Sequence, residues 1–256
     1  MQEVVAVDIG NSAIKLASRS SKSAWRIEAQ ATDEQLAESL SEFTTDLKSD
    51  SRWLVCCVDQ AQARRIQQWV AAKRPSDSFR LIEADEIPLA SEVTEREALG
   101  RDRLLAAWFA AAQTEQTEPA NSAIIIDGGT AITIDVVAAE KHLGGLIFPG
   151  PRTVLASLAE QTAALPDLAE ADPPKLGGEI QLGTSTEPAI LLGVHQSQLL
   201  GSIAIVESLE QQYAKAQVWC CGGLLAGCQS QLPKHWNFRS DFLTQAIFHL
   251  DETNSK

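Results

Sequence analysis

The chain has little positive charge with which to bind a polyanion. Acidic residues outnumber basic ones by 34 to 21, so the formal net charge is −13 at pH 7. No local cluster of lysine and arginine offsets this excess. An acidic protein repels phosphate backbones, and we therefore expect neither nucleic acid nor an anionic membrane as a partner.

Long apolar runs and targeting signals are also missing from the sequence. No apolar run reaches the length of about 20 residues that is needed to span a bilayer. The N-terminus leads directly into a strand-like segment and shows no charged and then apolar signal peptide. These two absences predict a cytoplasmic protein.

Cysteine and histidine are scarce, and neither is spaced as in a metal site. The five cysteines form the neighbouring pairs Cys56-Cys57 and Cys220-Cys221 plus Cys228, without the C-x-x-C spacing of zinc or redox sites. Because adjacent residues of a strand point to opposite faces, each pair should place one buried thiol on either side of a sheet. The histidines are scattered and show no metal-ligand spacing: His142, His195, His235 and His249.

What the chain does have is an ordinary globular composition, with 45% hydrophobic and 21% charged residues. Its 256 residues suit one large domain or two compact ones. A fully apolar strand at 53–58, further strands at 217–221 and near 80–82, and helical patterns indicate an α/β protein. The helical patterns lie near 33–47, 61–72, 101–113, 152–163, 188–213 and 242–250. Hydroxyls at 184–186 should cap the long helix, and Gly193 and Gly201 within it suggest close packing against another backbone.

Two Asp-tipped hairpins open the two halves of the chain. In the first, an apolar run ends at Asp8, and Gly10 and Asn11 tolerate the positive φ of a tight turn into a second strand. The second repeats this pattern over 123–135, with its acid, Asp127, 119 residues after Asp8. The polar stretch 114–122 reads as a linker. We therefore predict two similar α/β halves, 1–118 and 119–256, that face each other across a cleft.

The hairpins are candidates for a Mg-nucleotide site. A strand-tip carboxylate can hold hydrated Mg²⁺, and backbone N–H groups of a glycine turn can hold phosphate oxygens. Each hairpin alone could be purely structural, but two copies in one chain favour a shared ligand. Asp102, in the first turn of its helix, could likewise be a mere partner of the helix dipole.

Five ordered motifs carry a family resemblance. They are Asp8-Ile9-Gly10-Asn11-Ser12, Gly100-Arg101-Asp102-Arg103, Asp127-Gly128-Gly129-Thr130-Ala131-Ile132-Thr133, the segment Gly144 to Gly150, and Cys221-Gly222-Gly223. In this order, over nearly the whole chain, they resemble the type III pantothenate kinases. The resemblance implies the actin and sugar-kinase fold class, with two ribonuclease-H-like α/β halves and a nucleotide cleft between them. It also implies the ATP-dependent phosphorylation of pantothenate to 4′-phosphopantothenate, the first step of coenzyme A biosynthesis.

The resemblance assigns roles to residues of this chain. It implies that ATP, with Mg²⁺, is bound by the first loop, Asp8, Ile9, Gly10, Asn11, Ser12, Ala13, Ile14 and Lys15, and by Thr130. It implies that Asp127 is the ligand of a monovalent cation, K⁺ or NH₄⁺. Asp102 resembles the catalytic base, and pantothenate is expected to contact Gly100, Arg101, Asp102, Arg103 and Thr186. Members of the family are homodimers whose substrate pocket includes the partner subunit.

Some positions depart from the family pattern. The family commonly has a tyrosine and a proline where this chain has Val93 and Arg96, so one wall of the pantothenate pocket differs. Ser185 and Cys221 replace the usual Asn and Thr. None of these changes removes a charged catalytic group, and the group that meets the pantothenate carboxylate, Arg103 or a donor of the other subunit, stays open.

Two other functions remain as alternatives. Another phosphotransferase or phosphohydrolase of the same fold class would share the hairpins and the late Gly-Gly turn, but such relatives are mostly longer and lack the G-R-D-R segment. A non-catalytic nucleotide-binding regulator would have no need for a base, and Asp8, Asp102 and Asp127 are all present.

Overall fold

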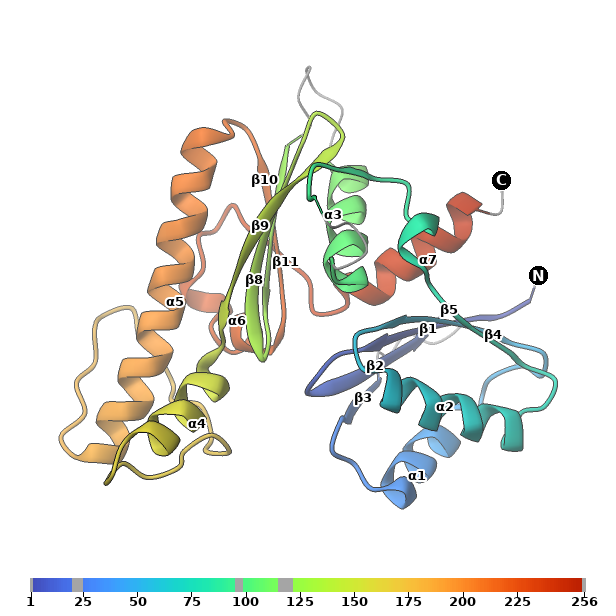
Figure 1. Ribbon diagram of the computed structural model, residues 1–256, viewed down its shortest axis with the longest axis horizontal. Coiled ribbons are helices and arrows are strands. Elements are labelled where there is room, and N and C mark those ends of the chain that lie inside the picture. Colours follow the sequence, from blue (N-terminus) through green and yellow to red (C-terminus); the bar gives the residue numbers. More distant parts are fainter. Residues whose placement is uncertain (1, 20–24, 95–98, 115–121, 255–256) are drawn as a thin grey trace. The chain divides into compact units, whose positions relative to one another are not determined.

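The computed structural model describes residues 2–19, 25–94, 99–114 and 122–254 of the chain (Figure 1). Its contacts divide the chain into two compact units. The first unit takes in residues 1–89, 93–109 and 241–256, and the second takes in residues 90–92 and 110–240. Each unit is an α/β body with its own sheet and core.

The first unit contains a five-stranded sheet in the order β3-β2-β1-β4-β5. Its strands are β1 (Val4–Ile9), β2 (Ala13–Ser18), β3 (Trp25–Glu28), β4 (Arg52–Cys57) and β5 (Ser78–Leu81). The first three form an antiparallel meander, and β4 and β5 run parallel to β1. Every residue of β1 is buried, as expected for a central strand covered on both faces.

Helices cover both faces of this sheet. α1 (Asp33–Phe43) and α2 (Gln60–Lys73) lie on one face, and α7 (Phe242–Asn254) lies on the other (Figure 1). α1 begins with a capping box, in which the Gln35 backbone N–H donates to Thr32 Oγ1 and the Thr32 N–H donates to Gln35 Oε1. α2 begins at an Asp59 cap, whose carboxylate accepts two backbone N–H groups. α3 (Arg101–Gln113) follows a 3₁₀ turn, η1 (Ala84–Glu86).

The second unit repeats the same sheet and adds one edge strand. Its order is β11-β10-β7-β8-β9-β6. The strands are β6 (Ala90–Ser91), β7 (Ala123–Gly128), β8 (Ala131–Ala138), β9 (Lys141–Pro149), β10 (Gln217–Cys221) and β11 (Asn237–Phe238). β7, β8 and β9 form an antiparallel meander, and β10 and β11 run parallel to β7. The expected pair of ribonuclease-H-like halves is thereby confirmed.

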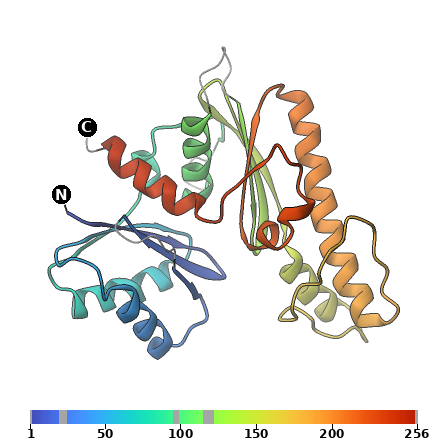
Figure 2. The same cartoon turned by 180° about the vertical axis from the view of Figure 1, so that it is seen from behind.

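The helices of the second unit are α4 (Pro151–Gln161), α5 (Thr186–Gln212) and the short α6 (Gly223–Gly227), with a 3₁₀ turn η3 (Gln229–Gln231). α5 runs alongside the second sheet and is also seen from behind in Figure 2. Leu199 and Val206 of α5 pack into the same apolar cluster as the isoleucines of β7 and β8.

The cysteines are buried, as predicted from the alternation of side chains along their strands. All five are buried free thiols. Cys57 belongs to the first core cluster together with Trp53 and Val55, so these alternate residues of β4 share one face, and Cys56 takes the other. Cys220 in turn belongs to the second core cluster.

The contacts divide the chain differently from the expected ranges 1–118 and 119–256. Residues 241–256 belong to the first unit, because α7 returns to pack on β1. Residues 90–92 belong to the second unit, because β6 pairs with β9. Most of the expected linker, residues 115–121, lies outside the described residues, as does Arg96.

Three local expectations were wrong. Neither Gly10 nor Asn11 adopts a positive φ, and the turn is closed instead by a bond from the Gly10 N–H to the Ala13 carbonyl at 3.0 Å. Ser185 occupies the N-cap of α5 without a side-chain cap hydrogen bond. Gly193 and Gly201 are not packed against another backbone, since a Cβ at either position would meet nothing within 4 Å.

α5 is more apolar than the sequence indicated. Among the described residues it alone is long and apolar enough to cross a membrane by length and composition, and its most apolar window has a mean hydropathy of 1.6. The expectation that no such stretch exists was wrong, because its interrupting residues are mostly uncharged. A core helix of a soluble protein meets the same test, but only 28% of this window is buried.

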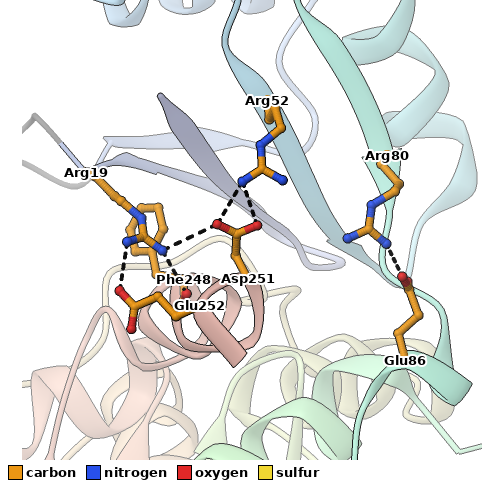
Figure 3. Close-up of polar contacts among 7 residues, drawn as sticks. All are labelled: Arg19, Arg52, Arg80, Glu86, Phe248, Asp251 and Glu252. Atoms are coloured by element: carbon orange, nitrogen blue, oxygen red, sulfur yellow. Dashed lines mark hydrogen bonds and ion pairs between the residues drawn. The ribbon is translucent and has the colours of Figure 1, made fainter. Parts of the chain in front are cut away.

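A buried carboxylate fastens α7 to the first sheet (Figure 3). Asp251, whose side chain is 6% exposed, accepts two hydrogen bonds from Arg52 Nη2 at 2.8 and 2.9 Å. Arg19 adds an ion pair to Asp251 at 3.5 Å and donates to the Phe248 carbonyl at 3.0 Å. The same guanidinium lies over the Phe248 ring and pairs with Glu252 at 2.7 Å. A further pair in the same view, Arg80 with Glu86, links β5 to η1.

We expect Asp251→Ala to lower the free energy of unfolding by about 2 kcal/mol, because it leaves two arginines without their buried acceptor. The matched control is Glu252→Ala, the next residue, whose exposed carboxylate pairs with Arg19 and should contribute less than about 1 kcal/mol. Urea unfolding of both variants measures the difference. Equal losses would show that Asp251 does not fasten α7.

Candidate active site

Asp8 is a buried carboxylate at the end of a central strand. It is 5% exposed, and its register partner across the β1–β2 hairpin is Lys15. Lys15 Nζ lies 3.4 Å from Asp8 Oδ2. An ionised carboxylate needs such a partner when it is removed from water. Asp8 and Lys15 therefore form an ion pair at the base of the first loop.

The rest of the first loop has a buried base and an exposed tip. Ile9, Ala13 and Ile14 are buried, whereas Gly10 and Ser12 are half-buried and Asn11 is exposed. Neighbouring strands hold the loop from both sides: the Val58 N–H donates to the Ile9 carbonyl, and the Ala29 N–H donates to the Ser12 carbonyl, both at 3.1 Å. The loop tip is therefore open to a ligand while its position is fixed by the sheet.

Asp102 lies in the first turn of α3, folded back over Gly100. A Cβ added to Gly100 would lie 2.4 Å from Asp102 Oδ1, closer than any side chain allows. The Leu104 N–H donates to the Gly100 carbonyl at 3.1 Å, which begins the helix at this point. A glycine is thus required for the observed position of the Asp102 carboxylate.

The charges of Asp8 and Asp102 both act on one buried thiol, Cys56. Cys56 is the register partner of Asp8 on the adjacent strand β4. Burial raises the pKa of Cys56 well above its ordinary value, and the negative charges of Asp8 and Asp102 raise it further. Arg101 acts in the opposite direction. The structure therefore brings Asp8 and Asp102, which are far apart in the sequence, into the same neighbourhood.

The two arginines of the G-R-D-R segment have different surroundings. Arg101 donates to the Glu83 carboxylate from Nη2 at 2.6 Å and from Nε at 3.2 Å. Arg103 passes beside Gly100, where its Cδ would lie 3.9 Å from an added Cβ. The Arg103 side chain and the Asp102 carboxylate therefore both lie beside Gly100. The Arg101 guanidinium is instead bound by the Glu83 carboxylate.

The β7–β8 hairpin of the second unit, which carries Asp127, is closely contacted by two glycines. Gly222, with φ +94°, approaches so closely that an added Cβ would lie 2.4 Å from Asp127 Oδ1 and 2.5 Å from the Gly128 nitrogen. A Cβ on Gly150 would lie 2.2 Å from the Gly129 carbonyl oxygen. These contacts explain why glycine is needed at Gly150, after the end of β9, and at Gly222, in the late Gly-Gly turn.

Asp127 and Thr130 are only partly exposed at this hairpin. Asp127 is half-buried, whereas the apolar strand before it predicted a buried carboxylate. The Thr130 carbonyl accepts from the Gly150 N–H at 2.9 Å and from Thr153 Oγ1 at 2.8 Å. Both lone pairs of that oxygen are therefore used within the protein. Thr186, the other expected residue of this unit, is exposed at the first position of α5.

Sequence reasoning missed several residues with notable surroundings. It did not identify Cys56 as the neighbour of both carboxylates, and it dismissed His142, which is fully buried and bonded to Asp135. An acid within an apolar strand, here Asp135, was the available signal. Within the described ranges, no group of three or more His, Cys, Asp or Glu side chains could hold a metal ion.

The chain is similar in sequence to known proteins. The family model for type III pantothenate kinase matches residues 4–208. The type III pantothenate kinase of Desulfovibrio desulfuricans is 29% identical over 241 residues, which cover 88% of this chain and 87% of the relative. That of Christiangramia forsetii is 32% identical over 181 residues, which cover 69% of this chain and 71% of the relative.

Solved structures show the same fold. A Baf family transcriptional activator from Campylobacter jejuni matches with a TM-score of 0.54 at 16% identity, covering 98% of both chains. A 2-dehydro-3-deoxygalactonokinase protein from Sinorhizobium meliloti matches with a TM-score of 0.50 at 16% identity, covering 98% of this chain and 96% of that one. With the family model matched over most of its length, the chain belongs to the type III pantothenate kinase family.

Proposed function

We propose that this protein transfers a phosphoryl group from ATP to pantothenate and forms 4′-phosphopantothenate, the first step of coenzyme A biosynthesis. The observation that carries the proposal is that the negative charges of Asp8 and Asp102 both raise the pKa of the buried Cys56 thiol. One carboxylate stands at a strand tip beside a loop suited to phosphate, and the other begins a helix in the G-R-D-R segment of the family.

The first loop fits a Mg-nucleotide. Asp8 supplies a carboxylate for hydrated Mg²⁺, and Lys15 beside it supplies a positive charge for phosphate oxygens. Bound Mg²⁺ would neutralise the charge that develops on the phosphates. The exposed Asn11 at the loop tip would offer its backbone N–H to the same phosphates. Thr130 of the second unit is the proposed second nucleotide contact.

Asp102 is the proposed catalytic base. Phosphoryl transfer passes through a loose transition state, so the protein mainly aligns the reactants and balances charge. Asp102 would orient the primary hydroxyl of pantothenate and accept its proton late, when the hydroxyl has become acidic. Gly100 is needed because any side chain there would displace the carboxylate.

The remaining substrate contacts come from the same segment and from α5. We assign the contact with the pantothenate carboxylate to Arg103, which lies beside Gly100 in the same segment as Asp102. Arg101 then shapes the segment by its bond to Glu83. Thr186, exposed at the start of α5, is the proposed further substrate contact.

Asp127 is the proposed ligand of K⁺ or NH₄⁺. Its partly exposed carboxylate lies against Gly222, where any Cβ would clash with Asp127 Oδ1. Thr130 cannot offer its carbonyl, which already accepts two hydrogen bonds. The carboxylate therefore dominates this site, and other carbonyls of the turn would complete it.

A homodimer is the proposed assembly, and α5 supplies much of its interface. Leu200 of α5 is 48% exposed, and Leu146 and Ile147 of β9 are 46% and 64% exposed. Exposed apolar area of this kind marks protein contacts. Gly193 and Gly201 leave shallow places where a partner helix could approach. Covered by a second copy, α5 is compatible with the cytoplasmic location that we propose.

Asp102→Asn tests the base. The change keeps the size and hydrogen-bonding reach of the side chain but removes proton acceptance, so turnover in a coupled ADP-release assay with pantothenate should fall by about 10²–10⁴. The control is Glu34→Gln, which likewise removes an acidic charge from the first turn of a helix, here α1. Near-normal turnover of Asp102→Asn would contradict the assignment. Absence of ADP release by the wild type in any salt would instead favour a nucleotide-binding regulator.

The cation site predicts a salt-specific rate. K⁺ and NH₄⁺, which are similar in size, should support turnover, and the smaller Na⁺ should support it poorly, because the loop carbonyls cannot close around it. Rates are measured in K⁺, NH₄⁺, Na⁺ and a bulky organic cation at matched ionic strength. Asp127→Ala should lose the difference between the salts. Equal wild-type rates in all four salts would rule out a cation at Asp127.

The dimer predicts that a charge on α5 separates the subunits. Leu200→Glu should convert a species of twice the 27.6 kDa chain mass into one of the chain mass, as measured by light scattering at micromolar concentration. The control is Val58→Glu, at a position 38% exposed in the first unit, which should leave the mass unchanged. A wild-type protein of single-chain mass would contradict the assembly.

A further inference from the structure

One side of the first loop is held by the chain that follows β3. This strand ends at Glu28, which lies opposite Ala13 of β2. The next residue, Ala29, donates its backbone N–H to the Ser12 carbonyl at 3.1 Å. This bond extends the β2–β3 ladder by one step into the loop that we propose for phosphate binding. The position of Ala29 therefore sets the position of Ser12.

Ala29 lies where the chain leaves the sheet. The Ala31 N–H donates to the Glu28 carbonyl at 3.0 Å, so the chain turns here before α1 begins. Ala29 is 4% exposed, and a backbone carbonyl that is removed from water needs a hydrogen-bond partner. Because β3 ends at Glu28, the partner of the Ala29 carbonyl comes from another element.

Two side chains of α2 supply the partners of this turn. Gln62 Nε2 donates to the Ala29 carbonyl at 2.6 Å. Arg65 Nη2 donates to the Ala31 carbonyl at 2.8 Å, and Arg65 Nη1 donates to Gln62 Oε1 at 2.8 Å. Residues three apart on a helix share a face, so both side chains can reach the same turn. We call Gln62 and Arg65 the α2 clamp.

The bond between the two clamp residues fixes the orientation of the Gln62 amide. A guanidinium only donates hydrogen bonds, so the amide oxygen faces Arg65 and the NH₂ group faces the Ala29 carbonyl. Arg65 also pairs with Asp33 at 2.7 Å, but the Asp33 side chain is 92% exposed, and such a pair contributes little. The clamp therefore acts mainly through the backbone carbonyls of the turn.

The start of the same helix lies next to the other side of the first loop. The Val58 N–H donates to the Ile9 carbonyl at 3.1 Å, and the following residue, Asp59, is the N-cap of α2. The Asp59 carboxylate accepts the backbone N–H of Gln62 at 3.3 Å. The N-terminal part of α2 is thus connected to both sides of the loop.

We propose that Gln62 and Arg65 are positioning residues for the nucleotide: they hold Ala29, whose N–H holds the Ser12 carbonyl, and so keep the first loop in the shape that receives the phosphates of Mg-ATP. This inference rests on the proposed function. A loop that is already held in its binding shape loses less conformational freedom when the ligand binds. The clamp acts through the Ala29 backbone, and its residues are therefore not catalytic.

Gln62→Glu tests the clamp with a change of one group. The new side chain has the same size and still accepts from Arg65, but it has no N–H to donate to the Ala29 carbonyl. The dissociation constant of Mg-ATP, measured by titration calorimetry, should rise about three- to tenfold, as expected for the loss of one hydrogen bond. The Michaelis constant for pantothenate should stay within about twofold. The matched control is Gln67→Glu, the same change at an exposed position of α2.

Hydrogen exchange in the protein without nucleotide gives a second readout. In Gln62→Glu the Ala29 amide should exchange faster by the same factor, whereas the Val58 amide, on the other side of the loop, should be unchanged. An unchanged dissociation constant of Mg-ATP, or unchanged exchange at Ala29, would overturn the clamp. If the wild type binds Mg-ATP but does not phosphorylate pantothenate, the proposed function is contradicted, and weaker Mg-ATP binding by Gln62→Glu would still support the clamp.

Discussion

The pairing of a buried carboxylate with a lysine across a hairpin is the constraint on which the first unit depends. Asp8 can end a fully buried strand because Lys15 stands opposite it in the antiparallel register. A slip of one residue would turn Asp8 to the other face and separate the pair. The same register sets Cys56 beside Asp8 on β4, where Asp102 also contributes to the local charge. The geometry of the proposed catalytic groups therefore begins with strand pairing.

The second unit solves the same structural problem by another route. Its hairpin acid, Asp127, is partly exposed, and the hairpin is held by close backbone approaches at Gly150 and Gly222. Glycine permits contacts that any Cβ would forbid, so the hairpin is fixed by shape rather than by a buried ion pair. This difference between two copies of one fold is consistent with different proposed ligands, Mg-nucleotide at Asp8 and a monovalent cation at Asp127.

Long-range attachments complete both units. α7 is fastened to the first sheet by Asp251 and its two arginines, and β6 is fastened to the second sheet by His142 and Ser91. Each attachment uses a buried polar group whose partners come from distant parts of the sequence. Such groups stabilise one arrangement strongly because any other arrangement would leave them unpaired.

The sequence by itself determined the fold class, the repeat of two Asp-tipped hairpins and the five motifs that identify the family, because strand alternation, glycine turns and motif spacing are local properties. It also predicted the helices α1, α2, α3, α4, α5 and α7 and the burial of the cysteines. Only the tertiary structure decided that Lys15 pairs with Asp8, that α7 returns to the first unit and that His142 is buried against Asp135. It also revealed the exposed apolar surface of α5. These features depend on which distant residues share a face or a register, and that depends on the packing of the whole chain.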